Sequence, residues 1–288
     1  MPEGVARRTP SGLPPDLAGL DRCLVMGVLN TTPDSFSDGG RYLDPEAAVA
    51  HGLRLAAEGA DLVDVGGEST RPGAARVDPD EERARVLPVV AALSAAGVRV
   101  SVDTMRAGLA AEAVDAGAVL VNDVSGGLAD PEMFATVARL EVPYVLMHWR
   151  GHSTTMQEHA DYDDVVADVR RELESRVDAA AEAGVDPDRV CLDPGIGFAK
   201  TAAHNWAVLH GLAAIHQLGL PVLVATSRKR FLGELLRDGE TLRAPVDRDD
   251  ATTATATLAA VAGAWCVRVH AVRATADAVR VAARWAEG

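Results

Sequence analysis

From residue 22 onward, short apolar segments alternate with longer amphipathic ones, and this alternation constrains the fold more than any other feature of the sequence. The apolar segments are rich in Val and Leu, as is typical of parallel strands buried on both faces. The segments between them are rich in Ala, Arg and Glu, and two begin with the helix-start signals Asp44-Pro45 and Asp78-Pro79. The expected strands span 22–30, 61–66, 98–103, 118–123, 142–148, 189–193, 220–226 and 265–270, and the expected helices span 44–58, 79–96, 105–116, 131–140, 161–184, 202–218, 249–263 and 271–286.

Strands and helices that alternate eight times predict an α/β fold, the (β/α)8 TIM barrel. A doubly wound open sheet is the alternative, but no G-x-G-x-x-G motif follows the first expected strand, which disfavours it. We therefore expect residues 22–288 to form one barrel domain. Residues 1–21 are rich in Pro, Gly and Arg and contain no apolar segment of the kind found in export signals, so we expect a disordered tail there.

The composition excludes several classes of partner. The formal net charge of −14 argues against nucleic acid and anionic membranes, which attract basic surfaces. No apolar run approaches the roughly 20 residues that a membrane span requires. Cys23, Cys191 and Cys266 lie in expected strands without a C-x-x-C pair, which indicates buried thiols in a reduced, cytoplasmic protein. The Ala/Thr-rich helix expected at 249–263 favours a homodimer.

Polar residues crowd the positions where the expected strands end, which is where a barrel carries its function. The helix-to-strand junctions at the opposite rim contain mostly Ala, Gly and Pro. This asymmetry indicates an enzyme. The polar strand ends are Asn30, 66–73, 101–104, Asn122-Asp123, Met147-His148, 193–198, 227–230 and 268–270.

The period-2 alternation within the strands indicates which of these side chains point into the barrel. In 98–103, Asp103 lies on the face opposite Val100 and Val102. By the same argument, Asp193, Arg268 and His270 point inward in their strands. A carboxylate in that position requires a partner or a ligand, because an unpaired buried charge is costly.

These residues suit a substrate with a flat heterocycle and an anionic part. Asp103, Asn122 and Asp193 can bind the N–H groups of a ring edge, and Lys229 can contact a ring carbonyl or nitrogen. Two structural alternatives stay open: Asp193 could serve only a turn in Asp-Pro-Gly, and Asp103 could cap the following helix.

The anionic part can be bound by basic residues at the same rim. Arg71, Arg268 and His270 can bind phosphate oxygens, although Arg71 could equally be an ordinary surface residue. Asn30 offers a neutral oxygen ligand for Mg²⁺, which usually accompanies phosphates. The loop that follows Asn30 is longer than a plain connection, and a simple turn is its alternative interpretation. No Ser or Cys shows the pairing that covalent catalysis requires.

Seven motifs in this order closely resemble those of the dihydropteroate synthases, the folate-pathway enzymes among the pterin-binding barrels. The resemblance spans about residues 22–286, and the motifs together are highly specific. They are MGVLNTTPDSFSDGG at 26–40, VGGESTRPGA at 65–74, VSVDT at 100–104, VNDVSGG at 121–127, LDPGIGFAKT at 192–201, TSRKRFLG at 226–233 and VRVH at 267–270.

The resemblance implies condensation of a dihydropterin methyl diphosphate with 4-aminobenzoate, with release of pyrophosphate. It implies that catalysis depends on Asp103, Lys229, Arg268 and His270, and that Mg²⁺ is bound at Asn30. Thr31 and Ala271 depart from the usual family residues, and Ala271 puts the orientation of His270 in doubt. By the resemblance, the pterin diphosphate contacts Thr70, Asp103, Asn122, Asp193, Lys229, Arg268 and His270, and the 4-aminobenzoate, where sulfonamides compete, contacts Phe36, Arg71, Pro72 and Phe198.

Two further functions compete with this one. A related pterin-binding methyltransferase would act on methyltetrahydrofolate with a corrinoid partner, but the basic cluster and the STRPG and SRKRF loops favour the synthase. A paralogue that only binds pterin would be expected to lose Asp103, Lys229 or the Arg-x-His pair, and the sequence retains all of them.

Overall fold

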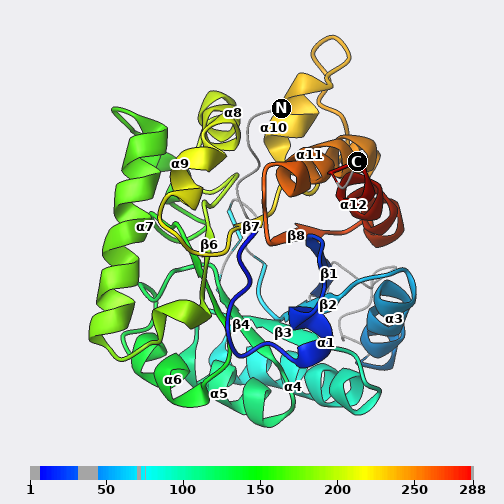
Figure 1. Cartoon of the computed structure of the whole chain (residues 1–288), viewed down its shortest axis with the longest axis vertical. Coiled ribbons are helices and arrows are strands. Elements are labelled where there is room, and N and C mark those ends of the chain that lie inside the picture. The colour runs from blue at the N-terminus through cyan, green and yellow to red at the C-terminus, as the bar shows by residue number, and fades with distance from the viewer. Residues whose placement is uncertain (1–6, 32–44, 70–72, 75, 287–288) are drawn as a thin grey trace.

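The computed structural model describes residues 7–31, 45–69, 73–74 and 76–286, and these residues form the expected barrel (Figure 1). Eight parallel strands pair in the order β6-β5-β4-β3-β2-β1-β8-β7. A parallel bridge between Leu192 and Val222 joins β6 to the residue before β7, so the barrel is nearly closed. The strands are β1 (Leu24–Asn30), β2 (Leu62–Gly66), β3 (Val100–Asp103), β4 (Leu120–Asp123), β5 (Tyr144–Met147), β6 (Val190–Asp193), β7 (Leu223–Val224) and β8 (Cys266–Val269).

The helices surround the strands, as Figure 1 shows. The helix expected at 202–218 is two helices that divide at Gly211, where a Cβ would lie 2.7 Å from Val166 of the neighbouring helix. Two helices, α1 and α10, were not predicted. The helices are α1 (Pro15–Ala18), α3 (Pro45–Ala57), α4 (Pro79–Ala95), α5 (Ala107–Asp115), α6 (Met133–Leu140), α7 (Val165–Glu182), α8 (Ala202–His210), α9 (Leu212–His216), α10 (Arg230–Leu235), α11 (Asp249–Val261) and α12 (Val272–Ala286), with 3₁₀ turns η1 (Met156–His159), η2 (Pro187–Arg189) and η3 (Pro245–Arg248).

The strand alternation divides the core into two parts. Side chains such as Val63, Val65 and Val102 pack outward against the helices. The inward side chains near the amino ends of the strands form a separate apolar cluster, and those nearer the carboxyl ends are polar. The inner apolar cluster contains Leu24, Met26, Leu62, Leu120, Val145, Cys191, Leu223 and Cys266.

Residues 7–21 correct our expectation of a disordered tail at 1–21, of which residues 1–6 lie outside the described part. They lie against the barrel, and the buried side chains of Leu13 and Leu17 join the inner apolar cluster. Ser11 N–H donates to the carbonyl of Asp188 at 2.8 Å. The physical reason is that the amino end of the barrel leaves apolar side chains to be covered, and this segment supplies Leu residues that cover them.

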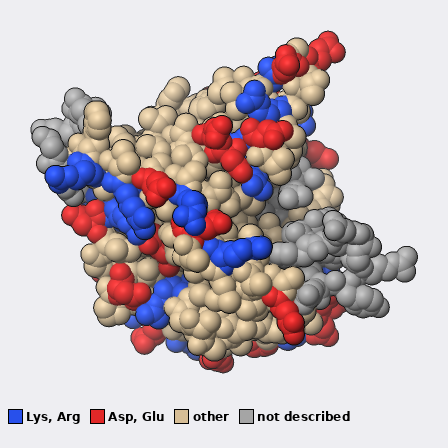
Figure 2. Space-filling view, turned by 90° about the vertical axis from the view of Figure 1, so that its right-hand side faces the viewer, with Lys and Arg blue, Asp and Glu red and all other residues tan. Residues whose placement is uncertain are grey.

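The cysteines and the composition of the described helices agree with the expectations drawn from the sequence. Cys23, Cys191 and Cys266 are free and buried, as expected. Within the described residues, no helix combines the length and the apolar content that a membrane crossing needs. On the face shown in Figure 2, acidic and basic side chains lie interspersed.

Candidate active site

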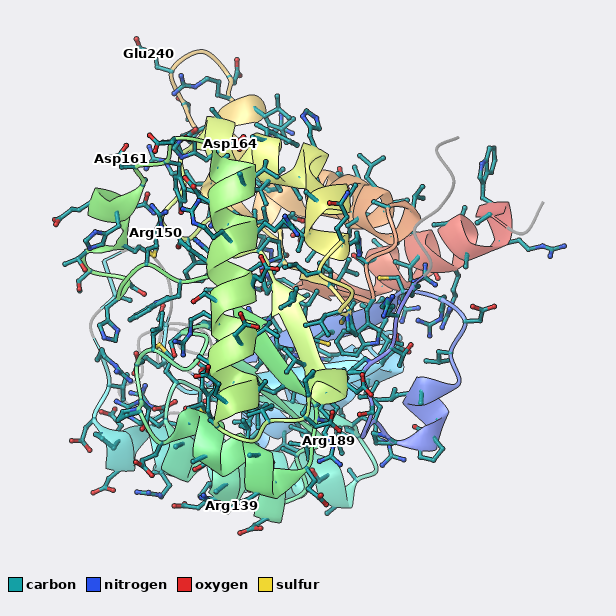
Figure 3. The ribbon with its side chains drawn as sticks, turned by 60° about the vertical axis from the view of Figure 1, so that its left-hand side comes forward. Arg139, Arg150, Asp161, Asp164, Arg189 and Glu240 are labelled. Atoms are coloured by element: carbon teal, nitrogen blue, oxygen red, sulfur yellow. The ribbon has the colours of Figure 1, made fainter. Side chains whose placement is uncertain are left out.

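The strand register places several predicted residues at one level of the barrel. Asn30 pairs with Gly66, Gly66 with Asp103, and Asp103 with Asn122. Across β5 this register reaches Cys191 through Val145, and Asp193, which pairs with Met147, lies two residues further toward the carboxyl end of β6. All of these positions lie at or next to the carboxyl ends of their strands, so the polar rim predicted from the sequence is confirmed. In Figure 3, Asp164 at the amino end of α7 and Arg189, which precedes β6, lie at opposite ends of this helix, and Arg150, which follows β5, lies nearer to Asp164.

Arg268 lies at the centre of a buried ionic cluster. Its Nε donates to Asp64 Oδ2 at 2.6 Å, and its Nη2 donates to Asp103 Oδ2 at 2.7 Å. Asn122 Nδ2 donates to the same oxygen of Asp64 at 2.9 Å. Burial raises the pKa of Asp103, and the Arg268 guanidinium acts in the opposite direction. The cluster therefore holds a carboxylate predicted to bind the ring, an amide and a cation in fixed positions.

Asp64 is the member of this cluster that our sequence analysis missed. Its side chain is fully buried, and its Oδ1 has no hydrogen-bond partner among the described residues. The alternation of Val63, Asp64 and Val65 was the signal that could have identified it, because it places Asp64 on the inward face of its strand.

Asp193 and Lys229 form the second part of the site. Asp193 Oδ1 accepts from the Gly195 N–H at 2.7 Å, so the turn that we weighed as an alternative is present. The carboxylate nevertheless retains capacity for a ligand, because each oxygen has two acceptor sites. Burial raises the pKa of Asp193, while the charges of Lys229 and Arg268 oppose that shift. Asp193 therefore lies within electrostatic reach of both cations.

Lys229 is fixed by the loop that follows β6. Its Nζ donates to the carbonyl of Ile196 and lies 4.9 Å from the centre of the Phe198 ring. Burial lowers the pKa of Lys229 to about 8, while the Asp193 charge acts in the opposite direction. This contact places Phe198, predicted to contact 4-aminobenzoate, beside a predicted pterin-binding residue.

The alternative role of Asp103 as a helix cap is wrong. Helix α5 begins after Arg106, whose N–H donates to Thr104 Oγ1 at 3.1 Å. The carboxylate of Asp103 points toward Arg268 instead.

His270 is oriented by a residue to which we gave no such role. Ser227 Oγ lies 2.9 Å from His270 Nδ1 and accepts from the His270 backbone N–H at 3.1 Å. These contacts bear on the doubt raised by Ala271, because Ser227, which follows β7, holds both the ring and the backbone of His270.

The end of β1 places Asn30 at the same rim. Asn30 is partly exposed, whereas the next residue, Thr31, is fully buried. Thr31 Oγ1 donates to the carbonyl of Gly66 at 3.0 Å, so this departure from the family pattern has a structural role. Among the described residues, no three His, Cys, Asp or Glu side chains gather as a metal site. The Mg²⁺ at Asn30 stays a prediction.

Four predicted residues, Phe36, Thr70, Arg71 and Pro72, lie outside the described residues. The segment beside them is fixed by Glu68, whose carboxylate pairs with Arg76 and Arg106 at 3.1 Å each. A small pocket opens between this segment and the β6 loop. It is lined by Glu68, Ala74, Arg76, Met105, Val124, Trp149, His152, Ser153 and Phe198.

Comparisons with known proteins agree on one family. A sequence profile of the family described as "Pterin binding enzyme" matches residues 26–270. The chain is 55% identical over 263 residues to the dihydropteroate synthase of Mycobacterium leprae, covering 91% of this chain and 93% of that protein. A dihydropteroate synthase structure from Xanthomonas albilineans with 4-aminobenzoic acid matches with a TM-score of 0.85 at 48% identity, covering 97% and 98%. One from Yersinia pestis in a sulfonamide drug complex matches with a TM-score of 0.88 at 40% identity, covering 98% and 100%.

Proposed function

The chain belongs to the pterin-binding enzymes, as a dihydropteroate synthase, and from this membership we propose that it condenses (7,8-dihydropterin-6-yl)methyl diphosphate with 4-aminobenzoate. The products are 7,8-dihydropteroate and pyrophosphate. Solved relatives from Xanthomonas albilineans contain 4-aminobenzoic acid in one structure and 7,8-dihydropteroate in another. The observation that carries the proposal is the buried cluster in which Asp103, Asn122 and Arg268 lie together at the carboxyl ends of the strands. The family membership favours the synthase over the two alternatives that we weighed, a pterin-binding methyltransferase and a paralogue that only binds pterin.

The pterin ring would lie between the ionic cluster and Lys229. Asp193 would accept the N–H bonds of the ring edge, and Asn122 can offer an additional donor or acceptor. The Lys229 ammonium would donate to a ring oxygen or nitrogen. Hydrogen bonds that involve charged groups contribute roughly 1.5–3 kcal/mol each, so this set of contacts can hold a small ring tightly.

The reaction forms a bond between the 4-aminobenzoate nitrogen and the pterin methylene carbon, and it breaks the bond from that carbon to the diphosphate oxygen. Positive charge develops on the methylene and spreads into the ring as the diphosphate leaves. The carboxylates of Asp64 and Asp103 would stabilise that charge, because fixed groups in a low-dielectric site act strongly on developing charge. The aniline nitrogen is a sufficient nucleophile, and the proton it loses passes to the departing diphosphate or to water. We assign Arg268 and His270 to the diphosphate side, together with Thr70.

The proposed Mg²⁺ would take one oxygen ligand from Asn30. The donor set fits, because Mg²⁺ usually keeps several waters and binds through substrate phosphates with only one or two protein ligands. When bound, the ion would neutralise charge on the diphosphate. We also propose that Phe36, Arg71, Pro72 and Phe198 frame the 4-aminobenzoate.

The homodimer remains a proposal, and it is supported by exposed apolar side chains on two neighbouring helices. Leu258 and Val261 of α11 are 68% and 50% exposed, and Val281 and Trp285 of α12 are 63% and 77% exposed. Helices α11 and α12 pack side by side, so these side chains can belong to one surface. Light scattering would test this: Leu258→Asp and Val281→Asp together should yield monomers, and a wild-type monomer would contradict the proposal. A cytoplasmic location stays a prediction.

The test of the proposed reaction is an assay for pyrophosphate release with and without 4-aminobenzoate. Release should depend on 4-aminobenzoate, and dihydropteroate should form in equal amount. Asp193→Asn should weaken binding of the pterin diphosphate about tenfold, which corresponds to about 1.4 kcal/mol. Arg268→Ala should weaken diphosphate binding more than pterin binding. Release without 4-aminobenzoate, or no release at all, would refute the proposal.

A further inference from the structure

Lys200 is a buried lysine that the proposed reaction does not use. It is 4% exposed and lies near the end of the loop that connects β6 to α8. Its Nζ lies 3.1 Å from the carbonyl of Gly195, 3.2 Å from that of Phe198 and 3.0 Å from His148 Nδ1. An ammonium has three N–H donors, so these three acceptors match its capacity.

The contact with Lys200 determines the protonation of His148. When Lys200 is protonated, Nδ1 accepts from the ammonium, which assigns the ring proton to Nε2, and Nε2 then donates to Glu172 at 2.9 Å. Burial and the Lys200 charge lower the pKa of His148 to about 4, so the ring is neutral near pH 7. Glu172 is also bound by Arg150, whose Nε donates to it at 3.0 Å. A continuous chain of hydrogen bonds thus runs from the surface of α7 to the β6 loop.

The loop that Lys200 contacts has a backbone that needs support. Gly195, Gly197 and Ala199 have φ angles of +67°, +84° and +47°. The positive φ of Ala199 is unfavourable for a residue with a Cβ, and such conformations persist where the surroundings impose them. The ammonium of Lys200 satisfies two carbonyls of this loop in the interior, where unpaired carbonyls would be costly.

The same loop determines the geometry of the pterin site in three places. The Gly195 N–H donates to Asp193, the Ile196 carbonyl accepts from Lys229, and the Phe198 ring lies against the Lys229 ammonium. Burial lowers the pKa of Lys200 to about 7, while the charge of Asp193 acts in the opposite direction. Lys200 is therefore coupled to the pterin site both through the loop and through its charge.

We propose that Lys200, held by His148, is a positioning residue that fixes the 195–200 loop and thereby the arrangement of Asp193, Lys229 and Phe198 for binding the pterin. Lys200 itself touches neither substrate. The role of His148 is to present a neutral acceptor to the ammonium. The inference rests on the proposed function, because the pterin is the ligand whose binding it explains.

Lys200→Met tests the proposal by removing the ammonium while keeping most of the apolar stem. The KM for the pterin diphosphate should rise about tenfold or more, with a smaller change in kcat. Arg176→Met is the control. Arg176 is a half-buried cation that, like Lys200, donates to a rim-loop carbonyl, that of Gly126 at 3.0 Å, but it does not contact the 195–200 loop. Its KM for the pterin diphosphate should equal that of the wild type.

Two variants of His148 separate positioning from a general loss of stability. His148→Asn retains an oxygen near the position of Nδ1 and should keep a KM for the pterin diphosphate close to that of the wild type. His148→Phe retains the ring but offers no acceptor, and its KM should rise as in Lys200→Met. If Lys200→Met does not fold, the comparison of the two His148 variants decides. Thermal unfolding shows which variants are folded.

Two results would overturn the inference. One is a folded Lys200→Met enzyme with a wild-type KM for the pterin diphosphate, and the other is an equal KM for the two His148 variants. These results differ from a failure of the proposed function, in which the wild-type protein itself would neither bind the pterin diphosphate nor release pyrophosphate.

Discussion

Replacement of Asp64 by Ala should destabilise the protein strongly, although no substrate contact has been assigned to Asp64. The fully buried carboxylate accepts from Arg268 Nε at 2.6 Å and from Asn122 at 2.9 Å. Removal of one partner of a buried ion pair costs about 3–5 kcal/mol, because the remaining charge stays buried. Arg268 keeps its contact with Asp103 and is 17% exposed, so we expect the lower end, about 3 kcal/mol. At about 2 °C per kcal/mol in a domain of this size, the Tm should fall by about 6 °C.

Asp64→Asn is the control for this prediction, because it keeps the shape and one acceptor oxygen while it removes the charge. It should cost about 1–2 kcal/mol, since a hydrogen bond to a charged group becomes one to a neutral group. Urea unfolding at equilibrium measures both variants, and calorimetry measures their pterin binding. A loss below about 0.5 kcal/mol for Asp64→Ala, the range of ordinary surface substitutions, would refute the view that Asp64 balances the buried guanidinium.

Three further perturbations test other parts of the structure. Gly195→Ala should weaken pterin binding about tenfold in calorimetry, because a Cβ at this position would lie 2.4 Å from the His148 carbonyl oxygen. Gly108→Ala is the control: no atom lies within 4 Å of its added Cβ, so pterin binding should be unchanged. Leu17→Asp should lower the free energy of unfolding, measured in urea, by about 2–4 kcal/mol, because a charge would enter the apolar cluster at the amino end of the barrel. An unchanged free energy of unfolding would instead support the expectation that this segment is disordered. Pterin affinity should fall as the pH rises through about 8, because burial lowers the pKa of Lys229 to about 8 and its ammonium is lost above that pH. The Lys229→Arg variant should show no such fall, since a guanidinium stays charged. An identical fall in the wild type and in Lys229→Arg would assign the titration to another group.

Local patterns in the sequence were sufficient to predict the barrel and the inward orientation of its polar residues. The period-2 alternation placed Asp103, Asp193 and Arg268 correctly, because the direction of a strand side chain depends only on its neighbours in the chain. The same rule applied to β2 would have identified Asp64. Thr70 and Phe36, by contrast, lie outside the described residues, so their roles stay predictions.

The pairing of these residues could not be predicted in the same way. Arg268 and Asp64 are 204 residues apart, and their contact depends on the register between β1, β2 and β8. The burial of Leu17 likewise depends on an opening at the amino end of the barrel that exists only once the strands have closed. Composition alone made residues 7–21 resemble a disordered segment, because Pro, Gly and Arg outnumber the few Leu residues that make the contacts.

The contacts of Arg268 also change our interpretation of the site. We expected acidic residues for the ring and basic residues for the diphosphate as two separate groups, but Arg268 binds two carboxylates directly. The carboxylates of Asp64, Asp103 and Asp193 thus lie near Lys229 and Arg268, and the buried Lys200 adds a third cation that acts on Asp193. Such a cluster favours a ring that becomes cationic, but it offers little net attraction to a diphosphate. A cation that arrives with the diphosphate would supply the missing positive charge, which is why a single neutral ligand such as Asn30 is sufficient for the proposed Mg²⁺.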